Sequence, residues 1–345
     1  MLLVINCGSS SLKYKLFDAK LKPVASGLNE RVNGDYAAAL SAAFSDLKKQ
    51  GFDVRDVRAV GHRVVHGGAA FVAPTKIDAR VIAKLKELYA LAPLHNPPNV
   101  LGIEASMKLL PGVPNVAVFD TALYRDLPDY AYMYALPYDL YEKHGIRKYG
   151  FHGISHGYVA SEAAKKLKKP LSKLKLVTCH LGSGASVTAM KNGKAVDTSM
   201  GFTPLEGLTM STRCGDIDPE IPLWLIRTLK MTPEQVDDLL NKKSGWLGLT
   251  GMSDLRDVIA KAEKGEKRSK LALEMFAYDV VRYIGQFMTV MGGCDAVVFT
   301  AGVGERSEKI RSMITRWLKP FKLKALVVPT DEERMIARET AEALK

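Results

Sequence analysis

Five places in the chain put basic, histidine or acidic side chains beside glycine, proline or a short apolar stretch. An arginine stands between glycines in residues 61–68, a histidine lies in the proline-containing turn 91–97, and another precedes a glycine in 151–153. A further arginine lies in 212–216, and Asp120 ends an apolar stretch. Guanidinium groups bind carboxylate and phosphate, and histidines stabilise a developing charge. Phosphoryl transfer requires such a set, because its catalysis is mostly positioning and charge neutralisation.

Three glycine-containing turns, residues 6–11, 180–186 and 301–305, each follow a short apolar stretch. Glycine permits φ > 0 and lets backbone N–H groups approach an anion closely. Each turn taken singly is explained equally well as an ordinary tight turn. The sequence contains neither G-x-x-x-x-G-K-[ST] nor a strand–G-x-G-x-x-G–helix unit, so neither a Walker loop nor a Rossmann dinucleotide site is supported.

The elements that must position these side chains alternate between strand and helix patterns, which predicts an α/β fold. We expect amphipathic helices at 36–50 and 79–91, and strands at 2–5, 12–17, 116–119, 174–179, 187–190 and 296–300. The first two strands should form a hairpin. Residues 176–183 repeat the pattern of residues 3–10 with a one-residue insertion, so we expect two similar halves.

Length and composition restrict the class of protein. The chain has 345 residues and a mass of 37.8 kDa, which points to about two domains. Apolar residues make up 47% and charged residues 25%, a composition that excludes a disordered chain. No apolar run approaches the roughly 18 residues of a membrane span, and the N-terminus does not resemble a secretory signal. Four cysteines without a C-x-x-C pair suit a reducing cytoplasm.

The net charge of 49 − 37 = +12 favours an anionic partner, which could be nucleic acid, anionic lipid or a phosphorylated small molecule. The lysine-rich run at 165–175 lacks interleaved aromatic residues. We therefore interpret it as a solvated helix end rather than a nucleic-acid surface.

A serine hydrolase is a remote alternative, because residues 153–157 fit the pattern G-x-S-x-G. No apolar strand precedes this segment, and only Glu162 followed by His180 supplies the acid and histidine in the required order. We interpret Ser155 as a helix N-cap instead.

Three longer motifs, residues 6–14, 201–208 and 212–216, closely resemble the acetate kinases of the acetokinase family. The resemblance runs from the first residue into the last helix. This family belongs to the acetate and sugar kinase/Hsc70/actin superfamily, which agrees with the internal repeat.

The resemblance implies a duplicated actin-like, ribonuclease H-like α/β fold with a cleft between two domains. The first domain would comprise residues 1–122 and 333–345. The second, residues 123–332, would carry most of the nucleotide site.

The resemblance also implies a role for individual residues. Asp120, His152 and Arg213 match catalytic residues. The substrate site would comprise Arg63, Val65, Leu94, His95, Phe151 and Pro204. Nucleotide contacts are implied for Lys13, His180, Leu181, Gly182, Ser183, Gly184, Asp254, Leu255, Arg256, Gly302, Val303, Gly304, Glu305 and Arg306. Asn6 and Glu332 match residues linked to Mg²⁺, with Mn²⁺ as an alternative metal.

The implied reaction is reversible, in-line transfer of the γ-phosphoryl group of ATP to acetate, which yields ADP and acetyl phosphate. Propionate, or another short-chain carboxylate, is the alternative acceptor. A non-catalytic, nucleotide-dependent interaction module is a remote alternative on the same fold. The family further implies a cytoplasmic homodimer that binds neither nucleic acid nor membrane.

The chain departs from the family in length and at several positions. It is a few dozen residues shorter, with the losses expected within 27–61 and 306–329. Ser183 replaces an asparagine in the phosphate loop, Cys214 replaces a serine, and Arg306 stands where an asparagine normally follows Gly-Ile-Gly-Glu. Two of these changes lie in nucleotide loops and therefore bear on the choice of phosphoryl donor.

Overall fold

The structure is a computed structural model that describes residues 1–8, 10–32 and 34–345; Ser9, in the first glycine-containing turn, lies outside the described residues. The chain divides into two compact units, which are described separately. The first comprises Met1–Arg125, Phe151–Tyr158 and Asp331–Lys345, and the second Asp126–Gly150 and Val159–Thr330. This division differs from the expected one in detail, because residues 123–125, 151–158, Asp331 and Glu332 belong to the first unit.

The first unit is built on a six-stranded sheet with the order β3-β2-β1-β4-β6-β5. Its strands are β1 (Leu2–Cys7), β2 (Ser11–Phe17), β3 (Pro23–Glu30), β4 (Ala59–Val64), β5 (Thr75–Lys76) and β6 (Asn115–Phe119). The pair β1 and β2 is antiparallel, which confirms the expected hairpin, whereas β1, β4 and β6 are parallel. The carboxyl ends of the parallel strands therefore lie at one edge of the sheet.

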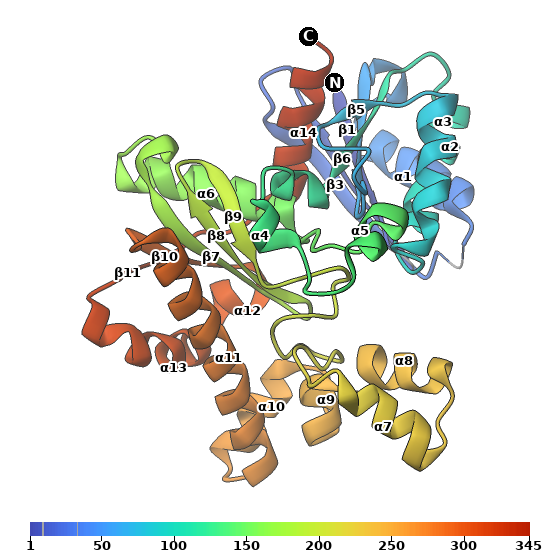
Figure 1. Cartoon of the computed structure of the whole chain (residues 1–345). Helices are drawn as coiled ribbons and strands as arrows, with labels where there is room; N and C mark the ends of the chain where they lie inside the picture. Colours follow the sequence, from blue (N-terminus) through green and yellow to red (C-terminus); the bar gives the residue numbers. More distant parts are fainter. Residues whose placement is uncertain (9, 33) are drawn as a thin grey trace. The chain divides into compact units, whose positions relative to one another are not determined.

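Helices cover both faces of this sheet (Figure 1). They are α1 (Tyr36–Lys49), α2 (Ala79–Glu87), α3 (Asn96–Leu109) and α14 (Glu332–Ala343). Leu3 and Ile5 pack in a cluster with residues of α1 and α3, and Leu2 and Val4 pack with Ile336 of α14. Successive residues of a strand point to opposite faces. The uninterrupted apolar run at the N-terminus is thus a strand buried on both sides.

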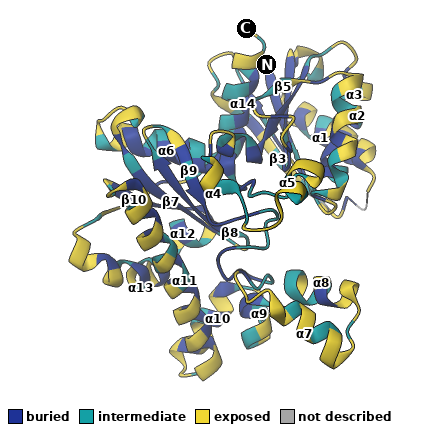
Figure 2. Cartoon of the chain, in the orientation of Figure 1, coloured by how far each residue is buried: buried dark blue, intermediate teal, exposed yellow. Residues whose placement is uncertain are grey.

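The second unit repeats this arrangement in a five-stranded sheet with the order β11-β10-β7-β8-β9. Its strands are β7 (Lys175–Leu181), β8 (Ala185–Lys191), β9 (Lys194–Thr198), β10 (Ala296–Thr300) and β11 (Lys324–Val327). The first three pair antiparallel, and β7, β10 and β11 are parallel. Taken from the other edge, as β9-β8-β7-β10-β11, these strands have the order and relative directions of β3-β2-β1-β4-β6 in the first sheet. The expected duplication is therefore confirmed. Figure 2 shows both sheets as mostly buried.

The remaining elements are helices and short 3₁₀ turns. The helices are α4 (Asp129–Tyr132), α5 (Tyr138–His144), α6 (Gly153–Leu167), α7 (Glu220–Leu229), α8 (Pro233–Lys242), α9 (Gly245–Thr250), α10 (Leu255–Glu263), α11 (Lys267–Met291), α12 (Ala301–Arg306) and α13 (Glu308–Leu318). The 3₁₀ turns are Val54–Asp56, Leu88–Ala90, Asp120–Tyr124, Leu171–Lys173 and Lys319–Phe321.

Three local expectations were wrong. His180 and Leu181 are the last residues of β7 rather than part of a turn, and residues 301–305 belong to helix α12 rather than to a turn. Ser155 is the third residue of α6 and fully buried, so it is not an N-cap. No strand of the described chain leads into α6, so the strand-to-helix turn that a hydrolase serine requires is absent there.

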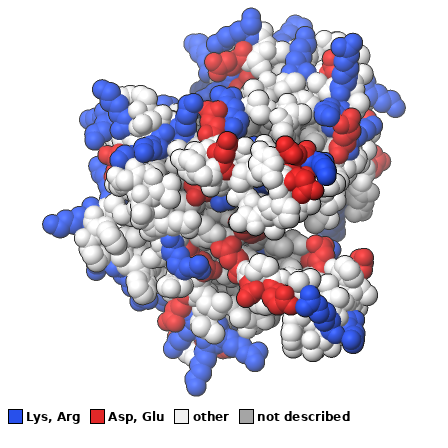
Figure 3. All heavy atoms as spheres, in the orientation of Figure 1, with Lys and Arg blue, Asp and Glu red and all other residues white. Residues whose placement is uncertain are grey.

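No helix among the described residues is long and apolar enough to cross a membrane. On the face shown in Figure 3, lysine and arginine side chains are interspersed with aspartates and glutamates.

Candidate functional site

A partly buried ion pair joins the ends of two parallel strands in the first unit. Arg63 lies near the end of β4 and Asp120 directly follows β6, and the register Val64↔Phe119 brings the two positions together. Nε and Nη2 of Arg63 donate to Oδ2 of Asp120 at 3.1 and 2.7 Å. Asp120 is only 1% exposed. Burial raises the pKa of Asp120, and the positive charge of Arg63 opposes that increase.

The other carboxylate oxygen of Asp120 has a different environment. Oδ1 is buried and accepts no hydrogen bond of normal geometry from the described residues. The backbone N–H of Ile154 nevertheless lies close enough to lower the pKa of the carboxyl group. A buried carboxylate oxygen without a full partner is costly unless a ligand completes its coordination.

The residues expected to bind a metal lie near this pair. Asn6 follows Ile5, which pairs with His62, so Asn6 is beside Arg63 at the strand ends. Glu332, the first residue of α14, is close enough to raise the pKa values of both Asp120 and Arg63. The described residues contain no group of three histidine, cysteine or acidic side chains arranged to hold a metal ion. One or two carboxylates with a neutral oxygen fit Mg²⁺, which takes its other ligands from water and substrate phosphate.

Two buried asparagines that sequence reasoning missed hold the segment after Arg63. Oδ1 of Asn99 accepts the N–H of Val65 at 3.0 Å, and its Nδ2 donates to the carbonyl of Cys7 at 2.7 Å. Asn96 makes the corresponding pair of bonds to the N–H and carbonyl of His66. Two polar residues near the start of a helix and beside prolines were the only available signal.

The segment that carries His152 is fixed by backbone contacts in the first unit. The hydroxyl of Tyr124 donates to the carbonyl of Phe151 at 2.7 Å. His152 has φ of 56°, a conformation that costs energy for a residue with a Cβ. A Cβ on Gly153 would lie 2.0 Å from the carbonyl oxygen of Asp120, so only glycine allows α6 to begin this close to Asp120.

The expected apolar substrate residues differ in exposure. Val65 and Phe151 are buried in the first unit, whereas Leu94 is 54% exposed. His95 is the N-cap residue of α3. Pro204 belongs to the second unit. The structure thus brings Val65 and Phe151 into the same unit as the Arg63–Asp120 pair.

Lys13 lies in the first unit, on β2, whereas the other residues expected to bind nucleotide belong to the second unit. Its Nζ lies 2.7 Å from Oε1 of Glu333, and Nζ of Lys15 lies 3.3 Å from Oε2 of the same residue. These ion pairs attach the start of α14 to the N-terminal hairpin. The expected nucleotide contact of Lys13 would therefore have to compete with Glu333.

Arg213 is a partly buried cation in the second unit. Its Nη1 donates to the carbonyl of Pro204 at 3.3 Å and contacts the sulfur of Met210 at 3.7 Å. Burial lowers the pKa of Arg213, and no carboxylate pairs with it in the described part of the chain. A guanidinium without a counter-charge is a suitable site for an anionic ligand.

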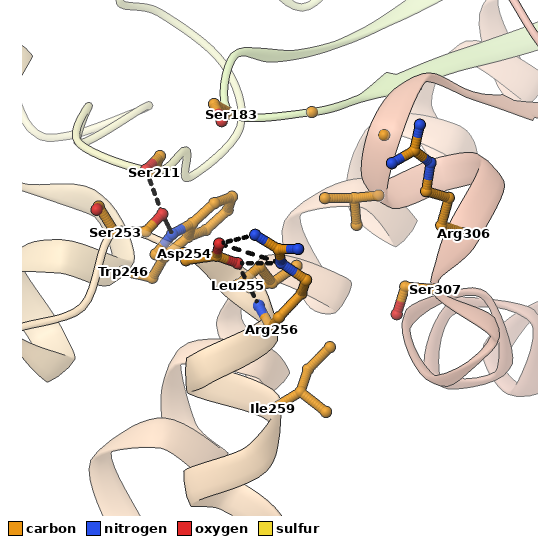
Figure 4. A pocket seen from close by; sticks show the side chains of 13 residues that line it. Ser183, Ser211, Trp246, Ser253, Asp254, Leu255, Arg256, Ile259, Arg306 and Ser307 are labelled. Carbon is orange, nitrogen blue, oxygen red and sulfur yellow. Dashed lines mark hydrogen bonds and ion pairs between the residues drawn. The ribbon is translucent and has the colours of Figure 1, made fainter.

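A pocket of about 720 Å³ lies in the second unit (Figure 4). Of the residues expected to bind nucleotide, it is lined by Gly182, Ser183, Asp254, Leu255, Arg256, Gly302, Val303 and Arg306. The lining also includes Ser211, Trp246, Ser253, Ile259 and Ser307, which sequence reasoning missed. A volume of this size can hold a nucleoside phosphate.

Six expected nucleotide residues are not part of this lining: Lys13, His180, Leu181, Gly184, Gly304 and Glu305. Glu305 has a structural role, because its Oε1 accepts the backbone N–H groups of Ala301 and Thr330 at 2.9 and 3.0 Å. Its carboxylate thereby connects the start of α12 to the segment that follows β11.

Ser211 connects three parts of the pocket wall. Its N–H donates to the carbonyl of Ser183 at 3.0 Å, and its hydroxyl donates to the carbonyl of Ser253 at 2.7 Å. Trp246 donates its indole N–H to that same carbonyl at 2.8 Å. Arg213 is only two residues further along the chain, so the pocket wall and this arginine share one short segment.

Residues 31–325 match the model of the acetokinase family.

The chain belongs to the acetokinase family.

Relatives of this acetokinase family member match it along the whole chain. It is 49% identical to "Acetate kinase" of Clostridium novyi over 394 residues, which covers 100% of this chain and 98% of the relative. At least 394 − 345 = 49 positions of the aligned relative therefore have no counterpart here, which confirms that the chain is a compact member.

Solved structures agree with this assignment. The acetate kinase of Porphyromonas gingivalis matches with 40% identity and a TM-score of 0.94, covering 100% of this chain and 99% of that one. A propionate kinase from Francisella tularensis matches with 38% identity and the same TM-score, covering 99% of each. A putative N-acetylmannosamine kinase from Listeria monocytogenes, at 12% identity, 100% and 99% coverage and a TM-score of 0.53, shares the fold alone. The duplicated actin-like fold is confirmed.

Proposed function

We propose that this protein transfers the γ-phosphoryl group of ATP to acetate, reversibly, to form acetyl phosphate and ADP. The observation that carries the proposal is the 49% identity with "Acetate kinase" of C. novyi over essentially the full length of both chains. The Arg63–Asp120 pair, the partly buried guanidinium of Arg213, which has no carboxylate partner among the described residues, and the pocket beside Ser183 support it. Each of these features serves the handling of anions.

The acceptor needs no general base in this reaction. A carboxylate with an ordinary pKa is ionised near pH 7, so one oxygen of acetate attacks the γ-phosphorus directly as the bond to the β–γ bridging oxygen breaks. The bridging oxygen leaves with ADP. The main obstacle is the repulsion between two anions, which Arg63 and Arg213 reduce by binding the acceptor carboxylate and the transferring phosphoryl group. His152 stabilises the charge that develops on that group.

Asp120, Asn6 and Glu332 are the proposed ligand set for a divalent cation, with Mg²⁺ as the expected metal and Mn²⁺ as the substitute. A bound Mg²⁺ neutralises phosphate charge and orients the donor. The incompletely hydrogen-bonded Oδ1 of Asp120 supports this assignment. Arg63 keeps Asp120 in a single orientation through its other oxygen.

We propose the second-unit pocket as the ATP and ADP site, with Ser183 and Gly182 toward the phosphates. Apolar atoms of Leu255, Ile259 and Val303 are suited to the nucleoside. The wider set of fourteen nucleotide-binding residues implied by family resemblance stays a prediction. In that set Glu305 has an indirect role, because its carboxylate holds the start of α12.

Acetate is preferred over propionate as the acceptor in this proposal. The curated relatives at 48–49% identity carry the name acetate kinase, and the propionate kinase structure is less similar, at 38%. Val65 and Phe151 would contact the methyl group, for which one extra methylene is worth about 1–3 kcal/mol.

A hydroxamate assay tests the function. The purified protein is incubated with ATP, Mg²⁺ and acetate, propionate or butyrate, and hydroxylamine traps the acyl phosphate. We expect acetate to give the highest kcat/KM, propionate less and butyrate least. Absence of acetyl hydroxamate from folded, nucleotide-binding protein would overturn the proposal.

We also propose a homodimer. None of the residues of α7 is buried, although Ile221, Leu223, Trp224 and Leu229 are large and apolar. A second copy of the chain would cover the exposed apolar side chains of this helix. Light scattering should give about twice 37.8 kDa, and Trp224→Glu should shift the mass toward the monomer. A monomer at micromolar concentration would contradict this proposal.

A cytoplasmic location is the remaining part of the proposal. All four cysteines are free thiols in the described structure, as is usual in a reducing compartment. Fractionation of the source cells with an antibody to the protein tests it, and recovery with the membrane or extracellular fraction would contradict it.

A further inference from the structure

Three ionisable side chains line the pocket of the second unit: Asp254, Arg256 and Arg306. Arg256 and Asp254 neutralise each other. Nε of Arg256 donates to both carboxylate oxygens at 3.0 and 3.1 Å, and Nη2 donates to Oδ2 at 2.5 Å. Hydrogen bonds from Arg256 lower the pKa of Asp254 to about 2, so the carboxylate is fully ionised at neutral pH. This pair contributes no net charge to the pocket.

Arg306 is different. It is exposed, lines the pocket, and makes no hydrogen bond or ion pair with any described residue. Figure 4 shows its side chain rising from α12, with the guanidinium pointing away from Ser307 and Ile259. The pocket lining therefore carries a net charge of +2 − 1 = +1, and the uncompensated charge is that of Arg306.

The position of Arg306 relates it to the turn after β7. Strand β10 pairs with β7 through Thr300↔His180, so α12 begins beside the Gly182–Ser183 turn. The ideal Cβ of Gly182 would lie 3.9 Å from Cβ of Ala301, the first residue of α12. Arg306 ends this helix, just over one helical turn beyond Gly302. Its long side chain can therefore extend back along the helix toward a ligand at the turn.

We propose that Arg306 binds a phosphate group of the phosphoryl donor and thereby sets the affinity of the pocket for that donor. The inference rests on the proposed function, of which it specifies one contact. A guanidinium only donates hydrogen bonds and presents two parallel N–H groups, which match the oxygens of a phosphate. Nε and Nη2 of Arg256 already donate to Asp254, and the charge of Arg256 is neutralised by that carboxylate, so Arg306 is the better phosphate ligand of the two.

Charge makes the phosphate chain, rather than the base, the part of the nucleotide that Arg306 contacts. The uncompensated +1 of the pocket is attracted by a polyanionic phosphate chain, whereas a neutral base offers only dipoles. The remaining polar side chains of the lining are serine hydroxyls, which both donate and accept. Arg306 is thus the one lining side chain with an unused, permanent charge among the described residues.

Three variants test this assignment. Arg306→Gln removes the charge, Arg306→Lys keeps it without the planar fork, and Arg316→Gln is the matched control, an exposed arginine on α13 outside the pocket lining. Binding of ADP, tripolyphosphate and adenosine is measured without acetate by calorimetry, and KM for ATP, GTP and acetate is measured in the coupled reaction.

We expect Arg306→Gln to weaken the binding of ADP and of tripolyphosphate by about tenfold, because it removes a charge-assisted contact to phosphate. Adenosine, KM for acetate and the Arg316→Gln protein should change less than twofold, while KM for ATP and GTP should rise equally. Arg306→Lys should recover part of the affinity. Salt should weaken ADP binding more in the unmodified protein than in Arg306→Gln.

Unchanged ADP and tripolyphosphate affinities in a folded Arg306→Gln protein would overturn the inference. So would an effect on adenosine or on ATP but not GTP, because either result assigns Arg306 to the base. The binding measurements need no acetate. If the protein fails to phosphorylate acetate but binds ADP through Arg306, the proposed function fails and this inference stands.

Discussion

Asp120 accepts two hydrogen bonds from Arg63 on one oxygen, Oδ2, while its other oxygen is buried without a hydrogen bond of normal geometry from the described residues. Pairing of this kind offsets the cost of burying both charges and holds the carboxylate in one orientation. This arrangement leaves the lone pairs of Oδ1 of Asp120 available to a ligand. Loss of either partner therefore has consequences for stability as well as for turnover.

Asp120→Asn keeps the shape of the side chain and removes its charge. We expect kcat to fall by at least about 10²-fold, because metal and phosphate orientation depend on the carboxylate. We also expect a loss of about 3 kcal/mol in the free energy of unfolding, because Arg63 loses its hydrogen-bonded counter-charge and keeps only the more distant charges of Glu332 and Glu333. Rates measured below the unfolding transition, with urea denaturation in parallel, separate the two effects. A near-normal kcat would show that the catalytic centre lies elsewhere.

The hydroxyl of Tyr124 positions the segment of His152 through the carbonyl of Phe151. Tyr124→Phe removes that buried bond and should lower the free energy of unfolding by about 1–2 kcal/mol. Because His152 follows directly, kcat should fall several-fold while KM for ATP changes little. Tyr130→Phe, at a residue that is 87% exposed, is the control. Equal kinetics for the two variants would count against the positioning role.

Ser211 donates its hydroxyl to the carbonyl of Ser253, which Trp246 also contacts. Ser211→Ala leaves one of the two donors and should raise KM for ATP by about three- to tenfold, consistent with a hydrogen bond worth about 1 kcal/mol. Ser211→Thr should restore most of the loss, and Ser312→Ala on α13 should have no effect. Steady-state kinetics at saturating acetate measure the change. A silent Ser211→Ala would indicate that Trp246 alone maintains this wall.

Val65 is buried, and its backbone is held by Asn99. Val65→Ala should enlarge the acceptor site and raise the ratio of kcat/KM for propionate to that for acetate by about tenfold, within the 1–3 kcal/mol of a methylene. Val72→Ala, at an exposed position, provides the comparison. An unchanged ratio would remove Val65 from the acceptor site.

His62 should make the protein less stable in mild acid. It is buried, and burial lowers its pKa to about 4 from an ordinary value of 6.5, although its Nε2 lies 2.7 Å from Oδ1 of Asn115. Between pH 6.5 and 4 the unfolded state binds a proton that the folded state does not, so stability falls as the pH falls through this window and is unaffected above it.

Urea denaturation at pH 7.5 and at pH 4.5 measures this dependence. The contribution of His62 is about 3 kcal/mol at its largest, because its pKa is about 4 in the folded state against an ordinary value of 6.5. His62→Gln retains a donor toward Asn115 and removes the titrating group, so its stability should depend less on pH. Identical pH dependence in the two proteins would assign the acid sensitivity to other groups.

Much of the fold follows from local patterns. The run Leu2–Ile5 is apolar at every position because both faces of β1 are covered, by α1 and α3 on one side and α14 on the other. The hairpin and its repetition as β7 and β8 were predictable because the strands are adjacent in the chain and a short turn permits only antiparallel pairing. The helix predicted at 36–50 ends one residue early, at Lys49, whereas the one predicted at 79–91 ends at Glu87 and is followed by the 3₁₀ turn Leu88–Ala90.

The positions of the arginines and of Asp120 were visible in the sequence, but their partners were not. Arg63 and Asp120 are 57 residues apart and meet only because β4 and β6 pair in parallel. Glu305 was expected to contact nucleotide, yet it accepts N–H groups at both ends of a 29-residue separation, Ala301 and Thr330. A single sequence shows which residues have side chains suited to chemistry. It does not show which of those side chains are already hydrogen-bonded to the backbone.

The amino-acid sequence by itself determined the α/β class, the duplication, the family and the residue types of the candidate site, because these depend on local periodicity and short motifs. Only the tertiary structure decided that Asn96 and Asn99 hold the strand end beside Arg63, that Ser211 joins three loops, and that Arg306 is unpaired while Arg256 is not. Most of these contacts join segments that lie far apart in the chain. The pairing of Asp254 with Arg256 leaves Arg306 without a carboxylate partner among the described residues. Their geometry exists only once the strands have paired and the helices have packed.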